Sequence, residues 1–217
     1  MLLQYAPPTK PYLDILYQDD VIVVFNKPSG LLSVPGKAEQ HKDSLEYRAR
    51  LVWPGIRLVH RLDMATSGIV IMALTADSQR ELNRQFQQRL TKKHYIATVS
   101  GKLSTESGSV DLPLICDWPN RPKQKVCFTS GKPSLTHYQL IEQNADSSKV
   151  ILVPVTGRSH QLRVHMQWLG HPILGDKFYA NEEQIKKATR LQLHAEQLTI
   201  FHPQSMQPMH FICPCPF

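Results

Sequence analysis

The order of short apolar runs and amphipathic segments is the feature that most constrains how this chain can fold. Residues 21–25 and 69–74 are apolar runs rich in β-branched side chains, which predicts buried strands. Residues 94–99 alternate, so that Tyr95 shares one side with two smaller apolar residues. In all, strands are expected at residues 21–25, 31–34, 69–74, 94–99, 149–153 and 193–201.

Amphipathic segments between these runs predict helices. Thr75 is placed to cap one of them, whose apolar stripe would be Leu82, Phe86 and Leu90. In a later helix, Arg158 would lie in the first turn and Gly170 would end the helix. The expected helices cover residues 43–51, 76–90, 158–168 and 182–188.

Helices and strands are thus mixed without a regular βαβ rhythm, and residues 101–131 are expected to be loop-rich. This order favours an α+β fold with a mixed, mostly antiparallel sheet flanked by helices and loops. A chain of 217 residues is long enough for one large domain or for two small lobes that share a core.

Composition excludes several classes of protein. No apolar run is long enough to span a bilayer, and the first residues lack the apolar core of a signal peptide, so we expect a cytoplasmic protein without a membrane. The four cysteines do not form a disulfide framework. Cys213 and Cys215 are interpreted as thiols in a tail, because no second pair of ligands has zinc spacing.

The charge distribution favours a polyanionic partner. The net charge is +7, and residues 80–132 contain ten Lys and Arg against four Asp and Glu, a local net charge of +6. Such a basic excess suits nucleic acid. A solvated cationic face without a partner is the alternative.

Three segments carry candidate chemistry. Arg61 and Asp63 are two residues apart, so in an extended segment both would project to one side with Leu62 opposite. A nearby guanidinium keeps a carboxylate ionised, and an ionised Asp can act as a nucleophile or base, although a structural ion pair would look the same. At the start of a helix, Arg158 opposes the helix dipole, which suggests a carboxylate or phosphate nearby. Tyr95 follows two lysines and could stack on a base or be a half-buried strand residue.

No cofactor is expected. The histidines are dispersed, no paired-carboxylate or HExxH pattern occurs, and neither a P-loop nor a GxGxxG segment is present. A catalytic metal and a nucleotide cofactor are therefore both disfavoured.

An ordered set of motifs resembles the RluA-type pseudouridine synthases. The motifs occur in the order of the family and span most of the chain, which makes the set far more specific than any one of them. They are Asn-Lys-Pro-Ser-Gly-Leu at 26–31, His-Arg-Leu-Asp at 60–63 with Thr-Ser-Gly at 66–68, Lys-His-Tyr at 93–95, Gly-Arg-Ser-His-Gln-Leu-Arg at 157–163, His-Pro-Ile-Leu-Gly-Asp at 171–176 and Leu-Gln-Leu-His-Ala at 191–195.

The resemblance implies one catalytic domain over residues 1–217, with a central cleft and no N-terminal S4-type domain. It implies that Asp63 is the essential carboxylate, that Arg158 pairs with it and that Tyr95 stacks on the target uracil. Arg61 would replace the flipped base and Leu193 would pack beneath the Asp–Arg pair. Further RNA contacts are expected from Arg80, Arg84, Trp118, Arg121, Lys123, Lys125, His160 and Arg163.

The reaction implied by the resemblance breaks the N1–C1′ bond of a uridine, turns the uracil and rejoins it through C5, with no redox step. Residues 112–126 are similar to an insertion of dual-specificity members, which act on 23S ribosomal RNA and on tRNA anticodon stem-loops. These RNAs are the expected partners of a monomeric enzyme. Two alternatives are a nucleosidase-type hydrolase, which ordinarily needs two opposed carboxylates, and a non-catalytic RNA-binding module.

Overall fold

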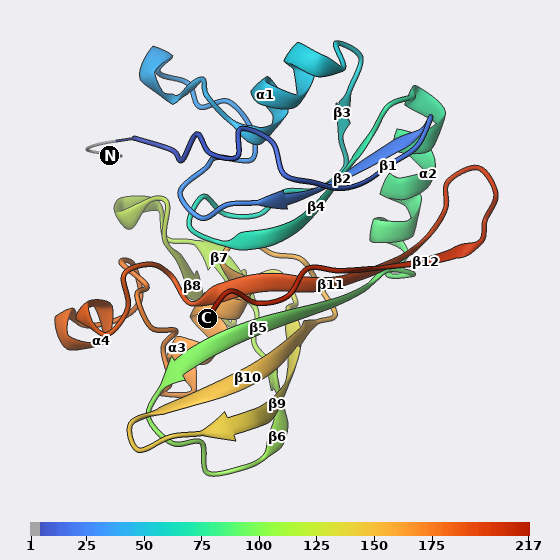
Figure 1. Ribbon diagram of the computed structural model, residues 1–217. Helices are drawn as coiled ribbons and strands as arrows, with labels where there is room; N and C mark the ends of the chain where they lie inside the picture. Colours follow the sequence, from blue (N-terminus) through green and yellow to red (C-terminus); the bar gives the residue numbers. More distant parts are fainter. Residues whose placement is uncertain (1–4) are drawn as a thin grey trace. The chain divides into compact units, whose positions relative to one another are not determined.

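A computed structural model describes residues 5–217 of the chain. The described chain divides into two compact units, whose elements are labelled in Figure 1. Unit 1 comprises the described residues up to Lys92 together with Ala195–Pro216, and unit 2 comprises Lys93–His194 and Phe217. Both units mix strands and helices, which confirms the α+β class.

The strands of unit 1 follow the order β1, β2, β4 and β11, with β3 on β4 and β12 on β11. β11 contributes to this unit from Ala195 onward. The registers of β1 with β2, β2 with β4 and β11 with β12 are all antiparallel. The elements are β1 Ile15–Gln18, β2 Ile22–Lys27, α1 Leu45–Val52, β3 Arg57–Leu58, β4 Ser67–Ala73, α2 Ala76–Gln87, β11 Leu193–Phe201 and β12 Pro208–Ile212.

The core of unit 1 is built from apolar residues of β2, β4, β11 and β12, with α2 against β4 (Figure 1). Every residue of β4 is buried, so this strand has no solvent face. From α2, Leu82 enters the core and Phe86 packs at its edge. The buried set is Val21, Ile22, Val24, Ile69, Ile71, Ala73, Leu82, Leu198, Ile200, Phe211 and Cys213.

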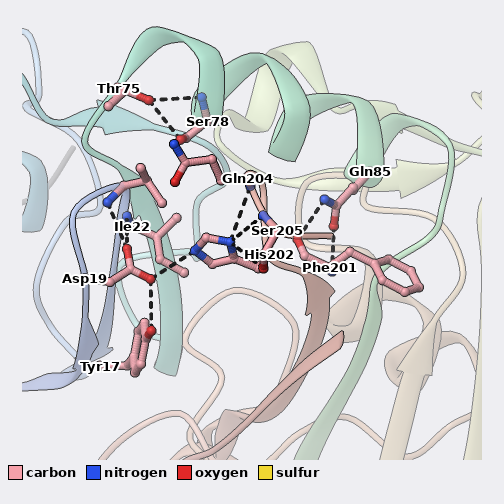
Figure 2. Close-up of polar contacts among 11 residues, drawn as sticks. Tyr17, Asp19, Ile22, Thr75, Ser78, Gln85, Phe201, His202, Gln204 and Ser205 are labelled. Carbon is pink, nitrogen blue, oxygen red and sulfur yellow. Dashed lines mark hydrogen bonds and ion pairs between the residues drawn. The ribbon is translucent and has the colours of Figure 1, made fainter. Parts of the chain in front are cut away.

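Polar side chains fix α2 in place, as Figure 2 shows. Thr75 caps the helix as expected: its Oγ1 accepts a hydrogen bond from the Ser78 N–H at 3.1 Å. Farther along, the fully buried amide of Gln85 donates to the Phe201 carbonyl at 2.8 Å and accepts from the Phe201 N–H at 2.9 Å. The Gln85 amide thereby satisfies both backbone polar groups of Phe201 at the end of β11.

A second polar cluster joins the turn before β2 to the turn after β11 (Figure 2). The Asp19 carboxylate accepts hydrogen bonds from the Val21 and Ile22 N–H groups at 2.8 Å and lies 3.1 Å from His202 Nε2. The Tyr17 hydroxyl also donates to it. Burial acts to raise the pKa of Asp19, but these hydrogen bonds outweigh it and hold the pKa below its usual value.

In unit 2 the strands follow the order β5, β10, β9 and β6, and β7 pairs with β8 in a separate hairpin. All these pairs are antiparallel. α3 packs against β8, β9 and β10. The elements are β5 Lys92–Ser100, β6 Ser107–Asp111, β7 Leu114–Cys116, β8 Gln124–Val126, β9 Leu135–Gln143, β10 Ser147–Pro154, α3 Gln161–Trp168 and α4 Glu182–Lys186. Within the described residues, no helix has the length and apolar character needed to cross a membrane.

Two expectations about helix ends are wrong. α2 ends at Gln87, so Leu90 is exposed and does not belong to the apolar stripe. Arg89 adopts a left-handed backbone with φ +59°, which ends the helical path. α3 begins only at Gln161, after His160 in a left-handed conformation, so Arg158 lies in a turn and not in a helix. The argument that Arg158 opposes a helix dipole therefore does not hold.

The strand predictions were incomplete. Residues 31–34 form no strand, because the carbonyls of Leu32 and Ser33 accept hydrogen bonds from N–H groups at the start of α1. The stretch 101–131, expected to be loop-rich, contains the short strands β6, β7 and β8. The nine-residue β9 was missed because its polar and apolar residues alternate on a half-exposed surface.

The Asp19 cluster generates a test of stability. Replacing Asp19 by Asn should lower the free energy of unfolding by about 1–3 kcal/mol near neutral pH, because the charged acceptor is lost. Since the folded-state pKa of Asp19 is depressed, its contribution is present above the unfolded value and lost as the pH falls through the lower folded one. Urea denaturation should therefore show the difference shrinking below about pH 4. Asp20→Asn, at an exposed neighbour, is the control; equal effects of both variants would contradict the assignment.

Candidate functional site

Asp63 lies in the irregular segment between β3 and β4 and is half-buried. Leu62 is buried and Arg61 is exposed, as the spacing predicted for an extended segment. The Asp63 carbonyl accepts a hydrogen bond from the Thr66 N–H at 3.1 Å, which closes a turn before β4. The backbone thus presents the carboxylate at the start of a fully buried strand.

The last residue of β2 and the segment after it hold this turn through three donors. Lys27 is completely buried, and its Nζ donates to the carbonyls of Pro28, Leu31 and Met64 at 2.8, 2.7 and 3.1 Å. The Ser29 hydroxyl donates to the Ala65 carbonyl at 2.7 Å, and the Gly30 N–H donates to the Met64 carbonyl at 2.8 Å. The Asn-Lys-Pro-Ser-Gly motif is therefore a support for the turn that carries Asp63.

Ser33 fixes the other side of Asp63. Its hydroxyl donates to the Leu62 carbonyl at 2.7 Å and accepts from the Leu62 N–H at 3.1 Å. Both backbone groups of the residue before Asp63 are thereby satisfied inside the protein.

Two further motif residues have structural roles. His60 Nε2 accepts a hydrogen bond from the Ile71 N–H at 3.1 Å, and its ring stacks on Phe86 with centroids 4.7 Å apart. Gly68 has φ +108°, and a Cβ there would lie 2.3 Å from the Ala195 carbonyl oxygen. The glycine is thus required where β4 and β11 approach each other.

In unit 2, Arg158 is exposed in a turn that Gln161 organises. The buried Gln161 Oε1 accepts hydrogen bonds from the Arg158 N–H at 3.0 Å and from the Thr156 hydroxyl at 2.7 Å. Gln161 Nε2 donates to the Leu135 carbonyl and to Thr136 Oγ1, both at 3.0 Å. One amide thus ties the Thr156–Arg158 turn to β9, while the Arg158 Nε donates to the Pro133 carbonyl at 3.3 Å.

Arg163, expected to contact RNA, lies inside unit 2 and is only 4% exposed. It forms a bidentate ion pair with Asp176, with both N–O distances 2.7 Å. Phe178 and Tyr179 cover the guanidinium, with ring centroids 5.2 and 5.1 Å from its carbon. The RNA-contact assignment of Arg163 is therefore wrong: the residue holds α3 to the His-Pro-Ile-Leu-Gly-Asp segment.

His160 joins the same framework from its left-handed position before α3. Its Nδ1 lies 2.6 Å from the Tyr179 hydroxyl, which accepts a hydrogen bond from the Gln124 N–H at 2.8 Å. Its ring stacks on Phe178. His160 remains partly accessible and connects α3 with the β7–β8 hairpin.

Tyr95 is half-buried on β5, opposite Leu152 of β10. Two residues earlier, burial lowers the pKa of Lys93, so this lysine is more readily neutralised than a surface lysine. Leu193 is buried at the start of β11. No group of three His, Cys, Asp or Glu residues among those described has the arrangement of a metal site.

The β7–β8 loop presents an exposed aromatic and several cations. Trp118 is 64% exposed, and the Arg121 guanidinium carbon lies 4.0 Å from the centroid of its ring. Asp117 supports the loop by accepting from Asn120 at 2.8 Å and pairing with Lys125 at 3.1 Å. Arg121 and Lys125 are exposed and Lys123 is half-buried.

Arg80 and Arg84 lie on α2 in unit 1, where each holds a carboxylate three residues earlier. Arg80 pairs with Asp77, and Arg84 pairs with Glu81 at 2.7 Å. These partners offset much of the positive charge, which makes α2 a weaker phosphate-binding surface than the sequence suggested.

The sequence pointed to the candidate catalytic residues but not to the residues that support them. Lys27, Ser29, Ser33 and Gln161 stood inside or beside motifs without an assigned role. A lysine directly after an apolar strand run is a usable signal, because a buried ammonium must find several acceptors nearby.

Lys27→Met should loosen the Asp63 turn. The methionine keeps the apolar volume but leaves the carbonyls of Pro28, Leu31 and Met64 without this donor, at an expected cost of about 1–3 kcal/mol in unfolding free energy. Amide hydrogen exchange at residues 62–66 should accelerate more than exchange in α2. Lys37→Met, at an exposed position of the same unit, is the control. Unchanged exchange in the turn would contradict the supporting role.

Arg163→Gln should destabilise the protein by about 3–5 kcal/mol, because it leaves Asp176 buried without its ion-pair partner. Thermal or urea unfolding measures this, with Lys177→Gln at an exposed neighbouring position as the control. The folded fraction should keep its affinity for RNA. Loss of RNA affinity without loss of stability would restore the surface role.

Comparison with known proteins identifies the family of this chain. The family model described as RNA pseudouridylate synthase matches residues 21–168. The dual-specificity RNA pseudouridine synthases RluA of Salmonella typhimurium and Escherichia coli are each 59% identical to this chain over 214 residues, covering 98% of both chains. RluA of Vibrio parahaemolyticus is 53% identical and covers the whole chain, with 88% of the relative matched.

Solved structures agree with these relatives. Human RNA Pseudouridylate Synthase Domain Containing 1 matches with a TM-score of 0.81 at 29% identity, covering 98% of this chain and 87% of that one. Human RNA Pseudouridylate Synthase Domain Containing 4 gives a TM-score of 0.75 at 27% identity, covering 94% and 88%. The family model over more than half of the sequence, and relatives that match it nearly end to end, show that this chain belongs to the RNA pseudouridylate synthase family.

Proposed function

We propose that this enzyme isomerises specific uridines of 23S ribosomal RNA and of tRNA anticodon stem-loops to pseudouridine, with Asp63 as the essential carboxylate. Membership of the family supports the reaction, and 59% identity to relatives named dual-specificity RNA pseudouridine synthases supports the use of two RNA classes. The observation that carries the residue assignment is the Asp63 turn, which buried Lys27 and Ser33 hold from two sides.

The reaction needs a carboxylate held in a fixed place. Breaking N1–C1′ and joining C5 to C1′ neither adds nor removes atoms from the product, apart from exchange of the C5 proton with solvent. Asp63 acts at the sugar, and Arg61, exposed beside it, occupies the gap left by the flipped nucleotide. Tyr95 and Arg158 of unit 2 serve the same reaction, with the buried Leu193 as an apolar support. No cofactor is required for this chemistry.

Binding of the remaining RNA is assigned to exposed or half-exposed groups. The stacked pair Trp118–Arg121 suits a base and its phosphate, and Lys123 and Lys125 extend the same loop. His160 belongs to this group through its link to Gln124 and Tyr179. Arg80 and Arg84 are retained as weaker contacts because of their carboxylate partners.

We also propose that both units serve a single catalytic domain over residues 1–217, of which 1–4 lie outside the described part. The family model runs through both units. A monomer acting in the cytoplasm, without a membrane, completes the proposal.

Asp63→Asn should abolish isomerisation while RNA affinity changes by less than about threefold, because the amide keeps the shape of the carboxylate but not its charge. The measurement is release of tritium from RNA labelled at uracil C5, since that hydrogen leaves only when C5 forms the new bond. Asp20→Asn is the matched control. A turnover-competent Asp63→Asn variant would remove Asp63 from the reaction.

The same assay separates the alternatives. Free uracil would indicate a nucleosidase-type hydrolase, and RNA binding without tritium release by the wild type would indicate a binding module. Carbodiimide mapping of RNA from cells lacking the protein should show the loss of sites in both RNA classes. Sites lost in only one class would limit the enzyme to that class.

A further inference from the structure

Two aromatic side chains outside the assigned residues are exposed on unit 2. Phe128 is 70% exposed in the loop after β8, and Trp168 is 55% exposed at the end of α3. Their ring centroids lie 6.1 Å apart at an interplanar angle of 71°. Phe128 is the most exposed large hydrophobic residue in the described part of the chain. Two large rings in contact and open to solvent are a common sign of a binding surface.

Backbone contacts hold the Phe128 loop in one conformation. The Cys127 N–H donates to the Pro113 carbonyl at 2.9 Å, and the Gly131 N–H donates to the Cys127 carbonyl at 2.9 Å. A Cβ on Gly131 would lie 2.3 Å from that same Cys127 oxygen, so the turn is as tight as a glycine permits. On the other side, Val164 of α3 packs with Leu114 of β7 in a buried cluster. The two rings therefore come from one packed framework and are preorganised for a ligand.

The sequence on either side of Phe128 carries a net positive charge, although Lys125 is paired with Asp117. Residues 118–141 contain Arg121, Lys123, Lys125 and Lys132 but no Asp or Glu. Lys132 is exposed four residues after Phe128, and Arg158 reaches the neighbouring Pro133 carbonyl through its Nε. A protein partner would favour a wider apolar patch with few charges at its centre. An aromatic pair whose loop is followed by an exposed lysine in a basic segment instead matches a chain of bases joined by phosphates.

We propose that Phe128 and Trp168 form a stacking platform for an unpaired base of the RNA substrate outside the target uridine. Lys132 binds the phosphate next to that base. The proposal rests on the proposed function for the identity of the RNA, and it adds a contact that orients the loop of the substrate. The Phe128–Trp168 surface contributes to RNA affinity, and other residues carry out the chemical step.

The first test replaces each ring by an aliphatic side chain. Phe128→Leu and Trp168→Leu should each weaken binding of a tRNA anticodon stem-loop by about tenfold, because base–aromatic stacking is lost. Tritium release at saturating RNA should stay within about twofold of the wild type. Tyr47→Leu, which removes an aromatic ring that is 44% exposed on α1, is the matched control. Unchanged affinity in both variants, or a change only in self-association, would overturn the proposal.

A second test locates the base. Abasic positions are introduced one at a time into the loop of the RNA, away from the target uridine. At the contacted position the abasic site should weaken wild-type binding by about tenfold and should leave Trp168→Leu binding unchanged, because the two changes remove the same contact. Equal losses in both proteins at every position would overturn the stacking assignment.

A third measurement remains valid if the enzyme does not act on these RNAs. In a Trp53→Phe, Trp118→Phe variant, Trp168 is the remaining tryptophan. Its fluorescence should be quenched by a single-stranded oligouridine, and Lys132→Gln should lower the affinity measured in this way. Quenching in this variant, together with no tritium release by the wild-type protein, would leave the platform standing and reject the proposed function. Tritium release by the wild-type protein, together with no quenching of Trp168 in the variant, would support the proposed function and reject the platform.

Discussion

The ammonium group of Lys27 is the constraint on which the candidate site in unit 1 depends. A charge with no exposed surface is stable only when all its donors are used, and here three carbonyls accept from it. One of these carbonyls belongs to Met64, next to Asp63. The need to satisfy a buried cation therefore fixes the backbone beside the proposed catalytic carboxylate. A neutral side chain at this position would place no such demand on the turn.

Unit 2 also contains a buried cation, which is stabilised by an ion pair. Arg163 and Asp176 are almost fully buried, and Asp176 also accepts hydrogen bonds from the N–H groups of Phe178 and Tyr179. Tyr179 in turn connects to His160 and to the β7–β8 hairpin. A single buried charge pair is thus connected, through Tyr179, to the start of α3 and to the hairpin, while Gln161 fixes the turn that carries Arg158. Both units thus hold buried charges in the segments that support proposed functional residues.

Much of the fold could be predicted from hydrophobic patterns alone. The buried strands β2, β4 and β11 and the cap at Thr75 follow directly from apolar runs and a hydroxyl before a helix. Elements such as β9 were not predicted, because their polar and apolar residues alternate and face partly to solvent. The start of α3 was misplaced because a left-handed His160 cannot be inferred from its neighbours.

The candidate site, like the fold, could be predicted only in part from local sequence patterns. Asp63, Tyr95 and Arg158 were identified from motifs that resemble those of the family. Their assigned roles remain predictions. Arg163 was misassigned because a basic residue near other basic residues resembles a surface cation, while its partner Asp176 is thirteen residues away. Long-range pairing is the information that a local pattern lacks. The Phe128–Trp168 contact joins residues forty positions apart and was invisible for the same reason.

The insertion of Lys93–His194 between the two segments of unit 1 bears on the order of folding during synthesis. Unit 1 takes its first segment from the start of the described chain and its second from Ala195–Pro216. Leu198, Ile200 and Phe211 of that second segment belong to its core. As the ribosome releases the chain, the strands that later pair with β11 keep apolar surface uncovered until Ala195–Pro216 has emerged. The strands between Lys93 and His194 are all synthesised before Ala195–Pro216, so they can pair with one another before the core of unit 1 is complete.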